Sequence, residues 1–245
     1  MTTTSAISVT AIMNRVAAEV GLETNPDPLS SNDQHFKQMQ FLLQTCGEEL
    51  CLAYPWEFLN GSHQIITAAI DTGEYDLPSD FHYMIPQTGW ERASNLPISG
   101  PLSPQDWAYM LGRELTNQVV YVSFRLRDGS FNILPQPVPA GLDIHFEYQR
   151  KTWVEDMDTG IAVPSDQVLS GSDVVMFDRT LITRMLKLKW LESKGFDTSK
   201  SQDDFNQVFG FLTGKDKSAE VLSAGGKWGS SYLNDSNIPV TGFGQ

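Results

Sequence analysis

Apolar residues recur at helical spacing near the start of the chain. The first stripe predicts a helix over about Ser8–Val20 with Gly21 as its stop, and consists of Val9, Ile12, Val16 and Val20. The second stripe keeps one continuous face and consists of Phe36, Met39, Leu43, Cys46, Leu50 and Ala53. Ser31 and Gln34 form a capping-box pattern before it, and Pro55 ends it because a residue that precedes proline is pushed out of helical geometry. We expect this second helix to be central to the fold.

From Trp56 to about Pro164 the apolar runs shorten to strand length, and Pro and Gly become frequent. The candidate strands are Gln64–Ala69, Glu74–Leu77, Val119–Arg127, Ser130–Leu134 and Leu142–Gln149. In the last of these, apolar and polar residues alternate, which predicts one buried and one polar face. Hairpin turns are expected at Asp71-Thr72-Gly73 and Asp128-Gly129, and one short helix at Pro104–Leu111 with Ser103 as its N-cap.

Helical spacing returns after Ser172. One stripe consists of Val174, Phe177, Leu181, Met185 and Leu188. A further helix is predicted over about Ser199–Leu222, with Phe205, Val208, Phe209 and Leu212 as its apolar set. The final stretch, Ala224–Gln245, is rich in Gly, Ser and Asn, yet it carries the large side chains of Trp228, Tyr232, Ile238, Val240 and Phe243. We interpret it as an extended arm.

This order of elements predicts an α+β fold, in which N- and C-terminal helices form one layer around a β-rich insertion. Residues 1–55 and 172–223 are expected to pack as one helical domain. Residues 56–171 are expected to form a β-rich lobe, and residues 224–245 an extended C-terminal arm.

The charge of the chain narrows the classes of function. The net charge is −13, and residues 1–60 carry 2 basic and 7 acidic side chains, whereas residues 171–245 carry 9 of each. Such an acidic balance argues against sequence-independent binding of nucleic acid, because that affinity comes from Lys and Arg neutralising phosphates. The acidic net charge fits two roles. It can keep the protein soluble through self-repulsion, or it can line a surface along which a polyanion passes without binding. No apolar run reaches the roughly 18 residues of a membrane helix, and Met1 to Val9 do not resemble a secretory signal, so we expect no membrane association and no export.

The residues supply no catalytic or metal-binding constellation that we can assemble. Cys46 and Cys51 lie on different faces of one predicted helix, which indicates free buried thiols. The four histidines are scattered, and His145 falls on the polar face of its strand, where we expect it to be solvated. The run Glu155-Asp156-Met157-Asp158 fails the calcium-loop spacing and is interpreted as a solvated loop. Arg150 and Lys151 are expected to form local salt bridges. We therefore expect no enzyme, no cofactor and no metal.

Two short motifs carry a resemblance. The first, Tyr54-Pro55-Trp56-Glu57-Phe58, ends a predicted helix, and the second is Tyr75-Asp76-Leu77-Pro78-Ser79-Asp80-Phe81. A helix that ends in an aromatic–Trp turn, followed by a hairpin that closes on Tyr-x-Leu-Pro-x-Asp-Phe, resembles the head-to-tail adaptor proteins of short-tailed bacteriophages, the tail tubular protein A type. Physically, Trp56 and Phe58 are suited to fill the seam between helices and first strand. Pro78 ends a strand, and Asp80 is suited to cap the next turn.

The resemblance implies a structural protein of the virion that assembles in the host cytoplasm. It implies helices that form a ring under the portal, expected to be dodecameric, and a β lobe that faces the tail. The implied partners are the portal ring, further copies of the chain, a downstream tail or nozzle protein, and DNA that passes without specific binding. No catalytic residues are inherited. Two other classes stay open: a monomeric ligand-binding β module, and a divergent carboxylate-dependent hydrolase built around Asp156 and Asp158.

The terminal arm leaves two possibilities open. Large apolar side chains are wasteful in a free tail, so the arm is expected to bind something. Gly225 and Gly226 separate it from the preceding helix, and no periodicity supports local packing, which favours a portal or a neighbouring subunit as its partner. The alternative is that the arm wraps back on its own subunit.

Overall fold

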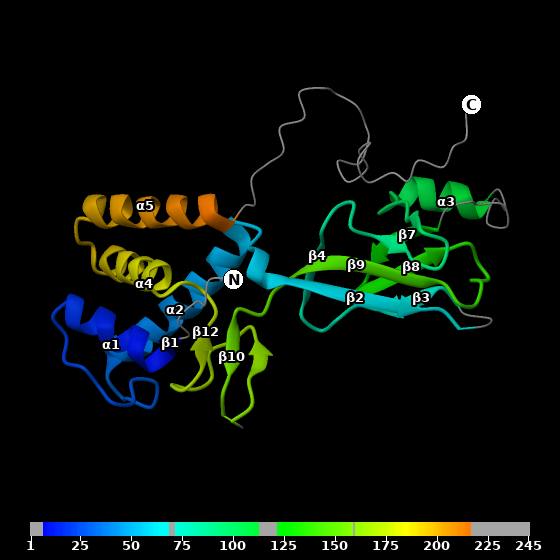
Figure 1. Cartoon of the computed structure of the whole chain (residues 1–245). Helices are drawn as coiled ribbons and strands as arrows, with labels where there is room; N and C mark the ends of the chain where they lie inside the picture. Colours follow the sequence, from blue (N-terminus) through cyan, green and yellow to red (C-terminus); the bar gives the residue numbers. More distant parts are fainter. Residues whose placement is uncertain (1–6, 69–71, 113–121, 159, 217–245) are drawn as a thin grey trace, which may run out of the picture.

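The computed structural model describes residues 7–68, 72–112, 122–158 and 160–216, and it has the α+β fold expected from the sequence. Figure 1 shows a helical layer and a β lobe that are joined by the long strands β2 (Asn60–Ile66) and β9 (Asp143–Arg150). The helices are α1 (Val9–Glu19), α2 (Gln34–Ala53), α3 (Pro104–Gly112), α4 (Arg179–Lys194) and α5 (Ser199–Asp216), and a 3-10 turn spans Glu57–Leu59.

The helical layer packs around α2, as expected. The apolar stripe of α2 is buried from Phe36 to Leu50, and the same core takes in the stripes of α1 and α4. Ser8 caps α1, and the carboxylate of Asp178 accepts hydrogen bonds from Thr180 and Leu181 at the start of α4. The left-handed conformation of Gly195 (φ 73°) ends α4.

Three details of the helix predictions are wrong. Asp33, and not Ser31, caps α2, because the Asp33 carboxylate accepts the N–H of His35 at 2.9 Å. Ala53 is exposed, since the chain leaves the core in the last turn of α2. Val174 belongs to a strand, and α4 begins only at Arg179.

A four-stranded sheet completes the helical layer. Its order is β1 (Ile7–Ser8), β12 (Val174–Val175), β10 (Val154–Asp156) and β11 (Val163–Ser165). Trp153, Val154 and Val168 lie in the helical core, and not in the β lobe to which the boundary at residue 171 assigned them. The physical reason is strand pairing: Ile7 pairs with Val175, and Val175 pairs with Val154. These pairs connect the second half of the insertion to β1, which directly precedes α1.

The β lobe consists of two sheets with a shared core. One sheet contains β2, β9, β5 (Trp90–Glu91), β6 (Leu96–Pro97) and β4 (Phe81–Met84), and the other contains β3 (Glu74–Asp76), β8 (Ser130–Leu134) and β7 (Ser123–Arg127). Phe131 stacks between Phe124 and Phe146, at centroid distances of 4.8 and 5.1 Å. These three rings join the two sheets.

Most of the predicted strand bounds lie within a few residues of the observed bounds, and those of β8 match in full. β8 has the predicted bounds, while β2 begins four residues earlier than expected and β9 is shifted by one. Ser103 caps α3 as predicted: its Oγ accepts the N–H of Asp106 and donates to the carboxylate of the same residue. The arm residues Trp228, Tyr232, Ile238, Val240 and Phe243 lie outside the described residues.

Candidate functional site

The first sequence motif lies where the helical layer meets the β lobe, in a region that we call the neck (residues 56–61 and 148–153). Trp56 is 3% exposed, and its ring packs against Phe58, Phe177 and Phe209 at centroid distances of 5.8 to 6.0 Å. The Trp56 indole N–H donates to the carbonyl of Leu50 at 2.7 Å, which satisfies one of the orphan carbonyls at the end of α2. Trp56 therefore fills the seam expected from the sequence and also closes the helix before it.

The second motif begins in β3, where Tyr75 pairs with Phe131, and its last residues, Asp80 and Phe81, reach the β-lobe side of the same neck. Tyr75, Leu77 and Phe81 pack on the β-lobe core, and Phe81 stacks on Tyr148 at 5.6 Å. The N–H of Phe81 donates to the carbonyl of Pro78, so the proline forms the corner that was predicted. Asp80 was predicted to cap the next turn, but the described contacts of its carboxylate are with β9. Its carboxylate accepts the hydroxyl of Tyr148 at 2.9 Å and lies 3.5 Å from Nε of Arg150.

Electrostatics at Asp80 reinforce this arrangement. Burial raises the pKa of the Tyr148 phenol, and the hydrogen bond to the Asp80 carboxylate raises it further. The phenol therefore stays protonated and acts as a permanent donor. Gly61 lies under this pair, because a Cβ there would meet Arg150 and Tyr148 at 2.8 Å. A larger residue at position 61 would therefore force the side chain of Arg150 or Tyr148 to shift.

Adjacent residues of β9 connect the two motifs. The side-chain amide of Gln149 donates to the carbonyl of Trp56 at 2.9 Å, and Arg150 pairs with Asp80. Gln149 is fully buried, although it lies on the face of β9 that the alternation predicted to be polar. Sequence reasoning missed Gln149, Tyr148 and Arg150 as connecting residues. The sequence contained no signal for them, because each partner lies more than 60 positions away.

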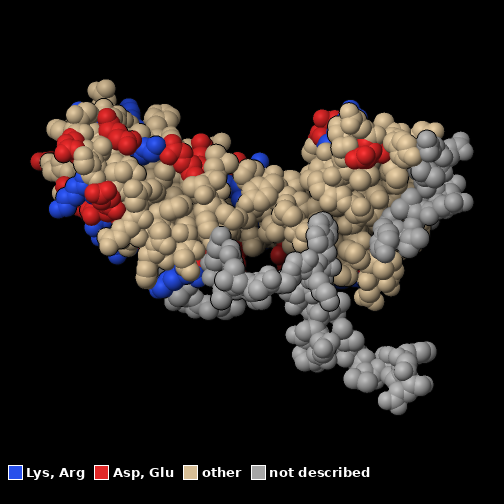
Figure 2. Space-filling model, turned by 90° about the horizontal axis from the view of Figure 1, so that it is seen from above, with Lys and Arg blue, Asp and Glu red and all other residues tan. Residues whose placement is uncertain are grey.

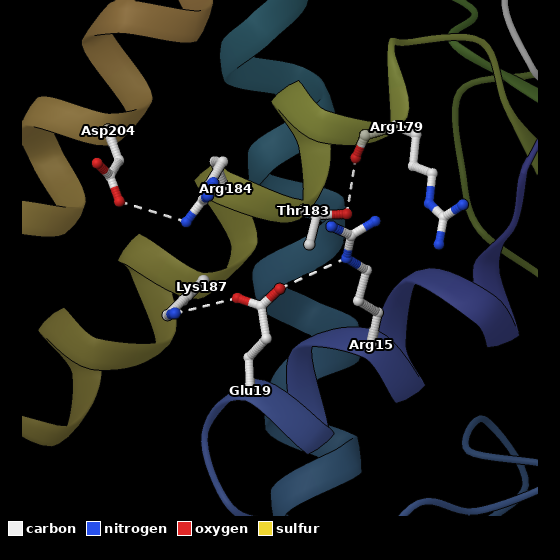
Figure 3. Close-up of polar contacts among 7 residues, drawn as sticks. All are labelled: Arg15, Glu19, Arg179, Thr183, Arg184, Lys187 and Asp204. Atoms are coloured by element: carbon white, nitrogen blue, oxygen red, sulfur yellow. Dashed lines mark hydrogen bonds and ion pairs between the residues drawn. The ribbon is translucent and has the colours of Figure 1, made fainter.

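The basic residues of α4 are used within the helical layer. Figure 3 shows Glu19 of α1 between Arg15 and Lys187, and Arg184 of α4 bonded to Asp204 of α5. Lys189 pairs in the same way with Glu49 of α2 at 2.8 Å. Although burial acts to raise the pKa of Glu19, its bonds to Lys187 and Arg15 outweigh burial and lower it. Arg184, Lys187 and Lys189 therefore hold α5, α1 and α2, respectively. Figure 2 shows acidic and basic side chains interspersed over this layer.

Three carboxylates beside β10 come close enough to share a cation. One oxygen from each of Asp156, Asp158 and Asp173 lies within 4.8 Å of the others, so part of the predicted loop is a strand and turn with an unexpected third partner. Hard cations prefer such oxygen ligands. However, buried Asp173 already accepts the N–H groups of Leu169 and Ser170, both at 2.8 Å, and of Met157 at 3.4 Å. An ion would have to compete with these bonds, which hold the turn to the strand.

One pocket in the β lobe bears on the ligand-binding alternative. It has a volume of about 130 Å³ and lies over Glu91, which is 2% exposed. The Glu91 carboxylate accepts the N–H groups of Ala93, Ser94 and Asp143 and the hydroxyl of Ser94. Burial acts to raise its pKa, but these bonds outweigh burial and lower it. Four donors occupy the carboxylate, and the pocket is smaller than the roughly 300 Å³ typical of small-molecule sites.

The remaining candidates are accounted for by local packing. Cys46 and Cys51 are free and buried, as predicted, and burial raises the pKa of both thiols. His145 is not simply solvated: it is partly buried, and its Nε2 lies 2.9 Å from the Asp143 carboxylate. Arg150 and Lys151 both form salt bridges, but neither partner is adjacent in the sequence: Arg150 pairs with Asp80, and Lys151 lies 3.9 Å from Asp166.

The chain matches no protein-family model and no curated protein sequence. Within residues 7–216, as far as they are described, no helix is long and apolar enough to span a membrane.

Proposed function

We propose that the protein is a non-enzymatic structural protein of a bacteriophage virion. In this proposal it is the head-to-tail adaptor of a short-tailed phage, joins the portal ring to the tail and lines the DNA conduit. It would act in the neck or tail of the particle after assembly in the host cytoplasm. Its partners would be the portal ring, further copies of itself in a ring that we expect to be dodecameric, and a downstream tail or nozzle protein.

The observation that carries the proposal is the convergence of both motifs on β9. Gln149 binds the carbonyl of Trp56, and Arg150 binds Asp80, so the residues of the resemblance work as one joint between two differently built parts. A connector has to hold two different partners at a fixed distance, and such a joint supports that role. The motif residues are used for packing, which fits a fold signature better than an inherited active site.

The charge distribution supports passage of DNA without adhesion. The net charge is −13, and the described cations Arg184, Lys187 and Lys189 are engaged by carboxylates of neighbouring helices. Paired cations cannot neutralise phosphates without losing their partners. Like charge along a conduit keeps DNA mobile.

Electron microscopy of the purified chain mixed with purified portal rings from short-tailed phages tests the proposal. We expect an added ring of density at one end of the portal. Two exposed aromatic residues provide a matched pair of variants: Phe41→Ser on α2 and Trp90→Ser in the β lobe, which are 75% and 44% exposed. Because the resemblance places the helices against the portal, Phe41→Ser should weaken ring attachment while Trp90→Ser leaves it intact. Portal rings that stay bare at a large excess of folded protein would contradict the adaptor role.

A further inference from the structure

Strand β2 has an edge that lacks the usual protection. It has seven residues, contains no charged residue and no Pro, and pairs only with β9 among the described strands. An exposed edge of this kind offers unpaired N–H and C=O groups to any extended chain, and proteins normally shorten, charge or interrupt it. None of these devices is present in β2.

The other edge strands are protected. β1 and β6 have two residues each, and the register of β4 is irregular between Phe81 and Tyr83. The remaining edges carry charges or proline: Glu74 and Asp76 in β3, Arg125 and Arg127 in β7, and Pro164 in β11. This contrast with the other edges indicates that another strand pairs with the free edge of β2.

The hydrogen bonds at the end of β2 show which groups face outward. Thr67 donates its N–H to Leu142 at 3.0 Å and accepts the N–H of Gly141 at 2.9 Å, so its backbone faces β9. Backbone direction alternates along a strand, so Ile65 and His63 also face β9. The N–H and C=O groups of Ser62, Gln64 and Ile66 therefore point away from β9, and no other described segment forms a backbone hydrogen bond with them.

β9 confirms this alternation independently. Its backbone groups at Asp143 and Glu147 bond to the opposite side, where Arg92 and Ile85 donate their N–H groups to them at 2.8 and 2.9 Å. Next to the outward groups of β2, the side chain of Ile66 is 66% exposed. A strand added here would complete the ladder and cover this apolar side chain.

We propose that residues 238–243 of the same chain add as a strand along β2. The described chain ends at Asp216, whose carboxylate accepts the N–H of Glu57 at 2.9 Å, three residues before β2 begins. Roughly 20 residues then lead to Ile238, and an extended chain of that length spans about 70 Å. The length of β2 is about 23 Å, so the segment reaches it in either direction.

The composition of the segment fits this edge. Ile238, Val240 and Thr241 favour strands, and residues 236–245 carry no charge, which avoids repulsion in a chain of net charge −13. Pro239 is compatible with a new edge strand if its missing N–H falls on the outer side. Of the two possibilities that the sequence left open for the arm, the position of Asp216 favours its own subunit. The proposal does not depend on the adaptor function.

Amide hydrogen exchange, measured residue by residue on the full chain and on a chain that ends at residue 225, tests the proposal. In the full chain the N–H groups of Gln64 and Ile66 should exchange at least ~10-fold more slowly than in the truncated chain. The N–H groups of His63 and Ile65 bond to β9, so they should be protected in both chains and provide an internal reference for an intact sheet.

Point variants of the full chain separate loss of the contact from loss of the fold. The double variant Ile238→Asp/Val240→Asp should abolish the protection of Gln64 and Ile66, whereas Ser230→Asp/Ser231→Asp adds the same charge elsewhere in the arm and should preserve it. Equal exchange of Gln64 and Ile66 with and without residues 226–245 would overturn the proposal. Protection that disappears on dilution, together with a dimer or larger species, would assign the edge to a second copy and overturn the same-chain assignment.

Discussion

Gly47 offers a sharp test of how the neck is attached to the helical layer. It lies within α2 and is covered by the indole of Trp153, the residue that links β9 to β10. A Cβ added at Gly47 would lie 2.2 Å from Cε2 and Cζ2 of that indole. Carbon atoms in contact are about 3.5–4.0 Å apart, so the overlap exceeds 1 Å. Trp153 is fully buried and cannot swing away.

Two opposing effects set the sign of Gly47→Ala. Alanine in a helix is favoured over glycine by up to about 1 kcal/mol. Overpacking a rigid core costs about 1–3 kcal/mol or more, and an overlap with a buried ring belongs at the upper end. We expect a net loss of about 1–3 kcal/mol in the free energy of unfolding. Gly210→Ala in α5 is the matched control, because nothing lies within 4 Å of the added Cβ, and it should gain about 0.5–1 kcal/mol.

Urea unfolding, followed by circular dichroism at neutral pH, measures both variants. The midpoint should fall for Gly47→Ala and rise for Gly210→Ala. In the combination Gly47→Ala/Trp153→Phe the smaller ring makes room for the new methyl group, so the double variant should lose less stability than the sum of the two single variants. A midpoint for Gly47→Ala at or above that of the unmodified protein would refute the packing of Trp153 on α2.

Three further outcomes are expected. Leu43→Ala removes a fully buried side chain from the stripe of α2 and should cost about 2–5 kcal/mol in the same assay; an unchanged midpoint would mean that this face is exposed, for example as a subunit interface. Folding lowers the pKa of Glu91, so the ionised carboxylate stabilises the folded state. Its contribution to the free energy of unfolding is complete above the ordinary pKa of about 4.3 and is lost as the pH falls through the lowered pKa. Glu91→Gln should therefore unfold at a lower urea concentration than the unmodified protein at pH 7, and the difference should shrink in acid. Millimolar Ca²⁺ should leave the melting temperature unchanged, whereas a site at Asp156, Asp158 and Asp173 filled at 100 times its Kd would add about 2.7 kcal/mol.

The helices were predictable because their information is local. A buried stripe such as Phe36 to Leu50 repeats within one element, and caps such as Ser103 and breakers such as Pro55 lie within a few residues of the ends that they define. The N-cap of α2 was missed because Ser31 and Asp33 are both good caps, and only the observed hydrogen bond of Asp33 decides between them.

The short strands were not predictable, because their partners are distant in sequence. β1 and β12 have two residues each, too few for any periodicity, and they form because Ile7 pairs with Val175. Because of that pairing, the helical layer includes residues before 172, such as Trp153 and Val154, which the sequence had assigned to the β lobe. Gln149 shows the same limit at the site: alternation placed it on a polar face, but it is fully buried and donates to the carbonyl of Trp56.

The neck combines strong packing with incomplete polar pairing. Trp56 is held by four aromatic rings, those of Tyr54, Phe58, Phe177 and Phe209. Asp80 is held by Tyr148 and Arg150. Yet buried polar atoms without a hydrogen-bond partner also gather here: Asn60 Oδ1, Gln149 Oε1, Arg150 Nε, Thr152 Oγ1 and Trp153 Nε1. The 3.5 Å contact of Arg150 Nε with Asp80 is an ion pair without hydrogen-bond geometry. Each such atom costs about 1–3 kcal/mol unless water reaches it. The aromatic packing must offset this cost, so stability at the neck depends on apolar contacts, and truncating Trp56 would weaken the helical core, to which Trp56 and its ring partners belong.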